Sequence, residues 1–305
     1  PIERSAGGGR ARLMVGARTG LRSAPGSLGS APGGVARSLR GTRLAQRVRY
    51  YLPAIVVFFG VLGLWELLVA ALDIRAFVLP APSAIVAALI ETWDSGRWPL
   101  GPAFVNTFVQ AIGGLLVGTI AGLVAAFLTA RWTTARDSIL PIAVALNAVP
   151  IIALAPLFNN WFGLTNPVSK MMVAALLVFF PIMINVTRGL SQVSAASLEL
   201  MRSYACSDWT ILRKVRIPNM LPFFFTALKV ATTLSLIGAI VAQYFGGASD
   251  VLGRIIVQSA SALRFDITWA AIVMASVTGI ALYLVVVAIE RVVIPWHASL
   301  REPEV

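Results

Sequence analysis

Residues 104–130 read FVNTFVQAIGGLLVGTIAGLVAAFLTA, a run without a single charged side chain. A helix needs about 20 mostly apolar residues to cross about 30 Å of hydrocarbon, so this stretch is long enough to span a membrane. Five further windows of this kind lie on either side of it: Leu52–Leu72, Ile139–Phe158, Val168–Val186, Phe223–Phe245 and Trp269–Val293. We therefore predict an all-α polytopic membrane protein with about six transmembrane helices.

The composition agrees with this class. Of 305 residues, 58% are hydrophobic and only 12% are charged, which is about half the charged fraction of a typical soluble domain. These values exclude an ordinary cytosolic enzyme and a disordered protein. The window at residues 139–158 is interrupted by Pro141, Asn147, Pro150 and Pro156. We expect that span to be surrounded by protein, because freed backbone carbonyls need partners at membrane depth.

Most of the net charge of +12 lies in the first 50 residues, which hold ten arginines and one acid, Glu3. Residues 1–49 show no apolar periodicity, so we predict a basic, disordered cytoplasmic tail close to anionic lipid headgroups. An organellar transit peptide is an alternative, since such peptides are also rich in arginine and poor in acids. Nucleic acid is not an expected partner, because no aromatic residue interleaves the arginines before Tyr50.

Loop charges predict the orientation of the spans. Basic residues cluster on the side of the tail: Arg131, Arg136, Arg188, Arg202, Arg213, Lys214, Arg216, Arg291 and Arg301. The opposite loops, residues 73–102, 159–167 and 248–268, carry no basic excess. By the positive-inside rule both termini are cytoplasmic, and residues 298–305 form a short C-terminal tail. Lys170, near the outer side, does not fit this pattern.

Several polar residues interrupt the apolar windows. We predict that Glu66 partners an outer loop or another helix, and that Lys229 and Glu290 are interfacial anchors. The candidates for the translocation pathway are amides, hydroxyls and an aromatic phenol: Asn147, Thr233, Ser235, Gln243 and Tyr244. Hydrogen bonding between helices is the alternative role for such groups, because a buried polar group needs a partner.

Gly114, Gly118 and Gly122 recur at four-residue spacing within the second window. Residues four apart share one face of a helix, so these glycines form a strip that lets another helix approach closely.

Motifs for catalysis and metal binding are absent. The sequence has no G-x-x-x-x-G-K-[ST] loop for nucleotide phosphates, and no H-E-x-x-H, C-x-x-C or G-x-S-x-G pattern. One histidine, His297, and one cysteine, Cys206, cannot build a metal site alone. We predict no catalytic residue, no metal and no cofactor on this chain, so uphill transport would draw its energy from another subunit.

The connection between the fourth and fifth windows, residues 188–222, is the most informative segment. Ser197 can cap a short helix with Glu199 in its first turn, and a second short helix is expected from about Asp208 to Arg216. Pro218 is expected to end the second helix before the fifth span. The prediction is a compact helix–turn–helix on the cytoplasmic face.

This segment resembles the cytoplasmic "EAA" loop of ABC-importer permeases, in which E-A-A is followed after three residues by Gly and after nine more by I-x-L-P. Glu199 takes the place of the Glu, Ala205 that of the Gly, and Val215–Pro218 that of I-x-L-P. Leu200 and Met201 replace the two alanines. Further matches to the nitrate/sulfonate/taurine branch are Leu79–Ser83, Trp161–Gly163, Phe179–Pro181 with Asn185, Phe245–Gly247 and Leu252-Gly253, within a similarity that covers residues 55–297.

The resemblance implies a type I ABC-importer permease domain at residues 50–297, with its coupling loop at 188–222, in the bacterial inner membrane. It implies two ATP-binding subunits that carry the ATP and Mg, an extracytoplasmic substrate-binding protein and a second permease copy, either identical or a paralogue. The residues that would couple to the ATPase are Glu199, Leu200, Met201, Arg202, Ser203, Tyr204, Ala205, Cys206, Ser207 and Asp208. Closure of the ATPase pair would move the docked helices and rock the spans.

The branch handles nitrate, sulfonates, taurine, bicarbonate, thiamine-precursor pyrimidines and riboflavin. No Arg or Lys lies at mid-membrane depth, which favours a neutral or heteroaromatic organic solute. An ion-coupled secondary transporter is the alternative function, but it is expected to show related halves, which the sequence lacks. An integral-membrane enzyme is disfavoured by the missing catalytic motifs.

Overall fold

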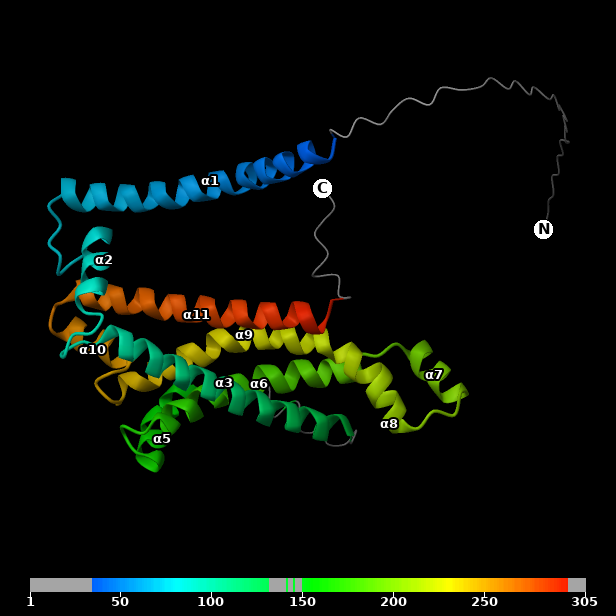
Figure 1. Cartoon of the computed structure of the whole chain (residues 1–305). Coiled ribbons are helices and arrows are strands. Elements are labelled where there is room, and N and C mark those ends of the chain that lie inside the picture. Colours follow the sequence, from blue (N-terminus) through cyan, green and yellow to red (C-terminus); the bar gives the residue numbers. More distant parts are fainter. Residues whose placement is uncertain (1–34, 132–140, 142–144, 146–149, 296–305) are drawn as a thin grey trace, which may run out of the picture. The chain divides into compact units, whose positions relative to one another are not determined.

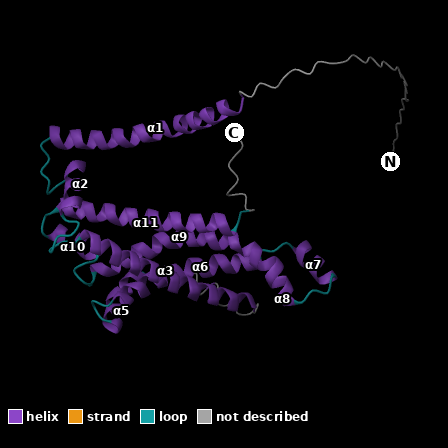
Figure 2. Ribbon diagram, viewed as in Figure 1, coloured by secondary structure: helices purple, strands orange, loops and turns teal. Residues whose placement is uncertain are grey.

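The structure is a computed structural model that describes residues 35–131, 141, 145 and 150–295. Within these residues every regular element is helical, as Figures 1 and 2 show. Five helices are long and apolar enough to cross a membrane: Leu52–Ala71, Leu100–Ala130, Pro167–Ser191, Asp208–Tyr244 and Phe265–Val293. The predicted all-α polytopic class is confirmed. The remaining predicted window, Ile139–Phe158, is described only at 141, 145 and 150–158, where Ile151–Phe162 is a shorter apolar helical segment, and Asn147 lies outside the described residues.

The chain divides into two units, residues 1–58 and 59–305. Helix α1 (Val35–Ala71) runs across this division. It begins within the segment that we predicted to be a disordered tail, so the helical part of the chain starts earlier than residue 50. Residues 35–49 are rich in Ala, Arg and Leu, which are good helix formers, and they are continuous with an apolar helix that extends them.

The centre of the second unit consists of α3 (Leu100–Arg131), α6 (Pro167–Ser191) and α9 (Ile217–Tyr244). Helix α6 packs along both α3 and α9, and its Val178, Ile182 and Val186 are fully buried between them. The start of α6 follows directly from its sequence: the Asn166 side chain accepts a hydrogen bond from Val168 N (3.0 Å), and Pro167 occupies the first turn.

The glycine strip of α3 lies against α6. A Cβ at Gly122 would lie 2.9 Å from the Phe179 carbonyl oxygen and 3.0 Å from Ile182 Cβ. Gly114 and Gly118 leave even less room, because the nearest α6 atom, Ala174 Cβ or the Ala175 carbonyl oxygen, would lie closer to an added Cβ than any atom does at Gly122. The two backbones can approach this closely only because the three positions carry no side chain.

Helices α2 (Pro82–Glu91) and α10 (Leu252–Ser261) lie at the end of the bundle where α11 (Phe265–Val293) begins (Figure 1). Glu66 of α1 accepts hydrogen bonds from the backbone N and the hydroxyl of Ser83, at 3.1 and 2.6 Å. It thereby binds the first turn of α2, which no side chain of its own caps. The predicted partner role of Glu66 is confirmed.

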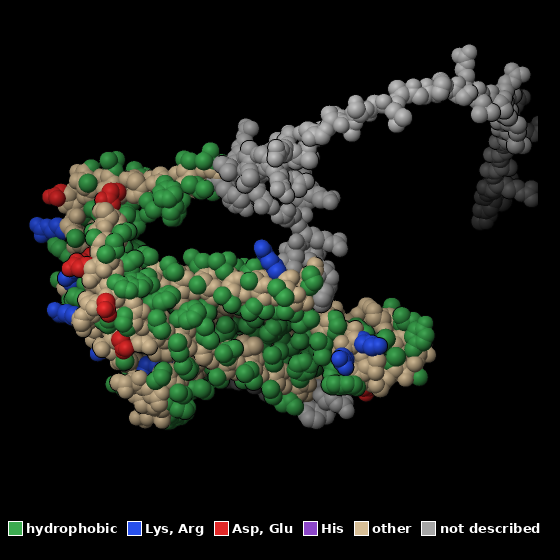
Figure 3. Space-filling model, in the orientation of Figure 1, with side chains coloured by type: hydrophobic (Ala, Val, Ile, Leu, Met, Phe, Trp, Pro, Cys, Tyr) green, Lys and Arg blue, Asp and Glu red, His purple; other side chains and the backbone are tan. Residues whose placement is uncertain are grey.

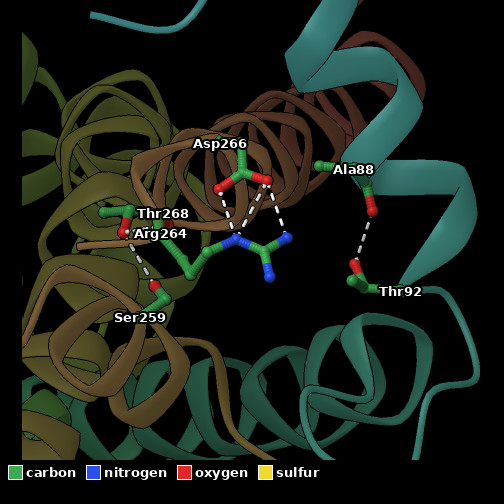
Figure 4. Close-up of polar contacts among 6 residues, drawn as sticks. All are labelled: Ala88, Thr92, Ser259, Arg264, Asp266 and Thr268. Carbon is green, nitrogen blue, oxygen red and sulfur yellow. Dashed lines mark hydrogen bonds and ion pairs between the residues drawn. The ribbon is translucent and has the colours of Figure 1, made fainter. Parts of the chain in front are cut away.

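Short polar contacts fix the turn between α10 and α11 (Figure 4). The hydroxyls of Ser259 and Thr268 lie 2.7 Å apart, and Arg264 Nη2 lies 2.9 Å from Asp266 Oδ2. The hydrogen bond to Asp266 raises the pKa of the Arg264 guanidinium above its usual value. In Figure 3, charged side chains gather at this end and around α7 and α8, whereas the face of the bundle in view between them carries mostly hydrophobic side chains.

The helix after the connecting loop does not stop at Pro218. Helix α8 (Asp208–Ile211), the π-helical turn η2 (Leu212–Arg216) and α9 form one continuous helical segment from Asp208 to Tyr244. The prediction of a break was wrong because Pro218 lies at the start of α9, directly after a wide π turn. A π turn shifts the preceding carbonyls, so a proline that lacks an N–H can be accommodated without ending the helix.

Candidate functional site

The connecting loop begins with helix α7 (Ala195–Ser203). Its N-cap is Ser194, whose hydroxyl accepts from Ser197 N at 3.2 Å. The predicted cap at Ser197 was therefore wrong by three residues, and Glu199 lies in the second turn instead of the first. The N-cap residue must have an extended backbone, and Ser194 has one, with φ −60° and ψ 135°. Ser197 lies inside the helix and cannot take this role. Glu199 is exposed and is free of a capping role.

A tight turn ends α7. Cys206 N donates to the Met201 carbonyl (3.1 Å) and Ala205 N to the Arg202 carbonyl (2.9 Å), the paired hydrogen bonds of a Schellman motif. Ala205 has φ +51°, in the left-handed region that favours glycine. Ala205 stands where the EAA pattern has Gly, so the backbone conformation here accounts for glycine at that place. The segment expected to couple to the ATPase, Glu199–Asp208, therefore comprises the end of α7, a turn and the first residue of α8.

Helix α8 has its own cap. The Ser207 hydroxyl accepts from Thr210 N (3.4 Å), and Asp208 lies in the first turn, where a carboxylate is favourable. The continuation of α8 into α9 means that the loop is joined to a membrane-spanning helix without a flexible link.

The surface of the loop carries large side chains that nothing in the described residues covers. Leu200, Tyr204 and Trp209 are 57%, 74% and 67% exposed. Glu199, Arg202 and Asp208 are also exposed and form no ion pair within the described part of the chain. Figure 1 shows α7 and α8 at the end of the bundle opposite α2 and α10. Exposed aromatic side chains next to charged side chains without partners are typical of a protein-binding surface.

The base of the loop is held firmly to the bundle. Asn219 Nδ2 donates to the carbonyls of Gly189 (2.8 Å) and Gln192 (3.2 Å), which ties α9 to the end of α6. A Cβ at Gly189 would lie 2.7 Å from Met220 Cα, so the two helices are in close contact there. A pocket of about 620 Å³ lies between the loop and the ends of α3 and α6, and its lining includes Arg202 and Arg216.

The predicted pathway residues divide into two groups. Ser235 donates to the Ala111 carbonyl of α3, and Gln243 is fully buried. Thr233 and Tyr244 are exposed on α9. The structure thus brings Ser235 and Gln243 into hydrogen bonds between helices, the alternative role for such groups. Asn147 lies outside the described residues.

Gln243 belongs to a polar network that the sequence did not indicate. Its Nε2 donates to Gln110 Oε1 (2.8 Å), and its Oε1 accepts from Gly253 N (2.8 Å). Thr107 Oγ1 accepts from Leu252 N (3.0 Å). Helix α10 has no capping side chain of its own, so two side chains from α3 and α9 satisfy its first free N–H groups. The one signal available in the sequence was Gly253, which admits the close approach, since a Cβ there would lie 2.7 Å from Gln243 Cβ.

Lys229 and Glu290 are not separate anchors as predicted. Lys229 Nζ lies 2.9 and 3.0 Å from the two Glu290 carboxylate oxygens, and Glu290 is buried. This ion pair joins α9 to α11. A single Lys and a single Glu at similar depths of two apolar helices were the sequence signal for it, because a charge in a membrane span generally pairs with another.

Comparison with known proteins decides the family. Residues 99–296 match the family "Binding-protein-dependent transport system inner membrane component". The chain belongs to this family. The match runs from the start of α3 past the end of α11, so it contains α3 to α11 with the α7–α8 loop, and α1 and α2 precede it.

Individual relatives of this permease are similar over most of their length. The riboflavin transport system permease protein of Chloroflexus aurantiacus is 27% identical, over 86% of this chain and 99% of the relative. The formylaminopyrimidine transport permease protein of Halalkalibacterium halodurans is 28% identical, over 79% and 94%. The taurine transport system permease protein of Escherichia coli is 24% identical, over 79% and 88%. The predicted ABC-importer permease family is confirmed.

Proposed function

We propose that this permease is the membrane-spanning subunit of an ATP-driven importer and that the α7–α8 loop docks on a separate ATPase. The observation that carries the proposal is the loop surface, where Leu200, Tyr204 and Trp209 are exposed beside charges that have no partner in the described residues. Exposed aromatic side chains of this kind supply most of the binding energy in protein interfaces. ATP and Mg would be bound by the ATPase, since this chain lacks a phosphate-binding loop.

The continuity of α8, η2 and α9 supports a mechanical coupling. A displacement of α8 on the ATPase would be transmitted to α9 as movement of one helical segment, because no loop separates them. The contact of Asn219 with the end of α6 would carry α6 along with it. The π turn at Leu212–Arg216 is the place where this segment would bend, since helix kinks commonly occur at π turns.

The remaining partners follow from the family. A soluble binding protein would deliver cargo from outside, and a second permease copy would complete the pathway beside two ATP-binding subunits. The predicted location is the bacterial inner membrane with both termini in the cytoplasm. Thr233 and Tyr244, the exposed members of the candidate set, are the proposed pathway residues on α9. The named cargoes of the relatives, riboflavin, formylaminopyrimidine and taurine, support a small organic molecule as the proposed solute.

The test is binding of the purified permease to its ATPase. Replacing Tyr204 or Trp209 by Ala should weaken binding about 10-fold to 30-fold, because truncating an interface aromatic commonly costs about 2 kcal/mol. Tyr283→Ala is the matched control, since Tyr283 is an exposed aromatic on α11, away from the loop. Unchanged binding in both loop variants would show that the loop is not the docking surface.

A further inference from the structure

Lys170 lies in the first turn of α6 and is 1% exposed. Its Nζ donates to Asn159 Oδ1 at 3.0 Å, to Ser169 Oγ at 2.9 Å and to the Leu164 carbonyl. All three acceptors are neutral. No carboxylate of the described residues forms an ion pair with Lys170, in contrast to Lys229, which pairs with Glu290. The amino group is thus held in place, but its charge is not neutralised.

Asn159 of α5 (Ala155–Phe162) lies next to Lys170 and is 5% exposed. Its amide N–H group is also unsatisfied in the described part of the chain. Its Oδ1 accepts from Lys170, but its Nδ2 is buried and has no hydrogen-bond partner within the described residues. Because Oδ1 faces Lys170, the amide group is fixed in this orientation and Nδ2 is directed to the other side. Lys170 and Asn159, called the cluster below, therefore combine a cation that has no counter-charge among the described residues with a free N–H donor.

Each of these features is costly in isolation. A buried amide N–H that lacks a hydrogen-bond partner destabilises the fold, and a buried charge without a counter-charge destabilises it more. Positive potential from the N-terminal end of α6 adds to that of Lys170. A group that carries both negative charge and acceptor oxygens would satisfy the amide and neutralise the cation together.

The cluster lies close to the surface of the bundle. Leu164, whose carbonyl binds Lys170, is itself 56% exposed. The turn after α9 borders the cluster: a Cβ at Gly246 would lie 3.5 Å from Asn159 Nδ2, and a Cβ at Gly247 would lie 3.8 Å from Lys170 Cε. The exposed Leu164 thus lies beside both polar groups, at the junction of α5, α6 and the turn after α9.

We propose that Asn159 and Lys170 form a binding site for a small oxyanion of the sulfonate, carboxylate or nitrate class. An oxygen of the anion accepts from Asn159 Nδ2, and its charge lies next to the Lys170 ammonium. Displacement of the Leu164 side chain opens the site. The existence of the site is independent of the proposed ATPase docking, whereas a role in transport would rest on that function.

The experiment is thermal unfolding of the purified full chain in detergent. Sodium methanesulfonate replaces sodium chloride at constant ionic strength. The unfolding midpoint of the wild type should rise by about 5 °C at one hundred times the dissociation constant. Asn159→Asp supplies an internal carboxylate beside Lys170, so this variant should be more stable without methanesulfonate and should lose the rise. Lys170→Gln should also lose it.

No rise in the wild type, or an equal rise in Asn159→Asp, would overturn the proposal. If Lys170→Gln does not fold, Asn159→Asp still decides, because it retains the lysine. Nitrate and inorganic phosphate, titrated in the same way, distinguish an organic sulfonate from an inorganic anion as the source of the ligand. Because this measurement contains no ATPase, its failure and a failure of the docking proposal are separate results.

Discussion

Replacing Gly118 by alanine tests the close approach of α3 and α6 with a single added methyl group. The new Cβ would lie 2.7 Å from Val178 Cβ and closer still to the Ala175 carbonyl oxygen. The carbonyl oxygen is part of the α6 backbone and Val178 Cβ is the branched root of its side chain, so neither atom can move aside cheaply. Overpacking of this kind costs about 1–3 kcal/mol.

The same substitution also gains helix propensity, because alanine in a helix interior is favoured over glycine by about 1 kcal/mol. Gly63 of α1 isolates this gain, since nothing lies within 4 Å of a Cβ at that position. Gly63→Ala should therefore be neutral or stabilising. The difference between the two variants measures the packing cost alone, and we expect Gly118→Ala to be about 1–3 kcal/mol less stable than Gly63→Ala.

The assay is denaturant-induced unfolding of both purified variants in the same detergent, with folded yield as a second readout. Gly118→Leu should reduce folded yield much further than Gly118→Ala, because a larger side chain meets the same α6 atoms. Equal midpoints for Gly118→Ala and Gly63→Ala would refute the reasoning, and would mean that α3 and α6 are separated at this depth.

Three further predictions concern the loop and the buried ion pair. Ala205→Gly should stabilise the α7–α8 loop by about 1 kcal/mol, since an L-residue with φ +51° is strained by about 1–2 kcal/mol; slower proteolysis or hydrogen exchange of the loop would show it. Glu199→Ala should change the unfolding free energy by less than about 0.5 kcal/mol, because Glu199 is exposed and caps nothing. If Glu199→Ala and Glu199→Gln both lose ATPase docking, the loss comes from removal of the carboxylate itself. Lys229→Met should destabilise by about 3–5 kcal/mol, because it leaves Glu290 buried and unpaired, and adding Glu290→Gln should recover much of the loss in an unfolding measurement.

The membrane spans and the glycine strip were predictable from sequence because both depend on local pattern. Length of apolar run determines which helices can cross a membrane, and four-residue spacing places Gly114, Gly118 and Gly122 on one face. The Lys229–Glu290 pair and the capping of α10 by Gln243 were not predicted, because each joins residues that are distant in sequence or depends on the angle between helices.

Within the α7–α8 loop, too, the sequence predicted only part of the structure. The motif spacing aligned Ala205 with the Gly of the EAA pattern, and the left-handed backbone at Ala205 agrees with a glycine there. Which of two serines caps α7 depended on backbone angles that the sequence does not specify. The effect of Pro218 depended on the π turn before it, so the expected helix end was wrong although the proline itself was an appropriate signal.

The most direct test of the proposed importer is solute uptake into proteoliposomes. The permease is reconstituted with and without its ATPase and binding protein, and uptake of the solute that the binding protein retains is measured with ATP or with an ion gradient. We predict uptake only when permease, ATPase, binding protein and ATP are all present, with the permease alone inactive and unable to hydrolyse ATP. Uptake by the permease alone, driven by an ion gradient, would contradict this account and establish a secondary transporter.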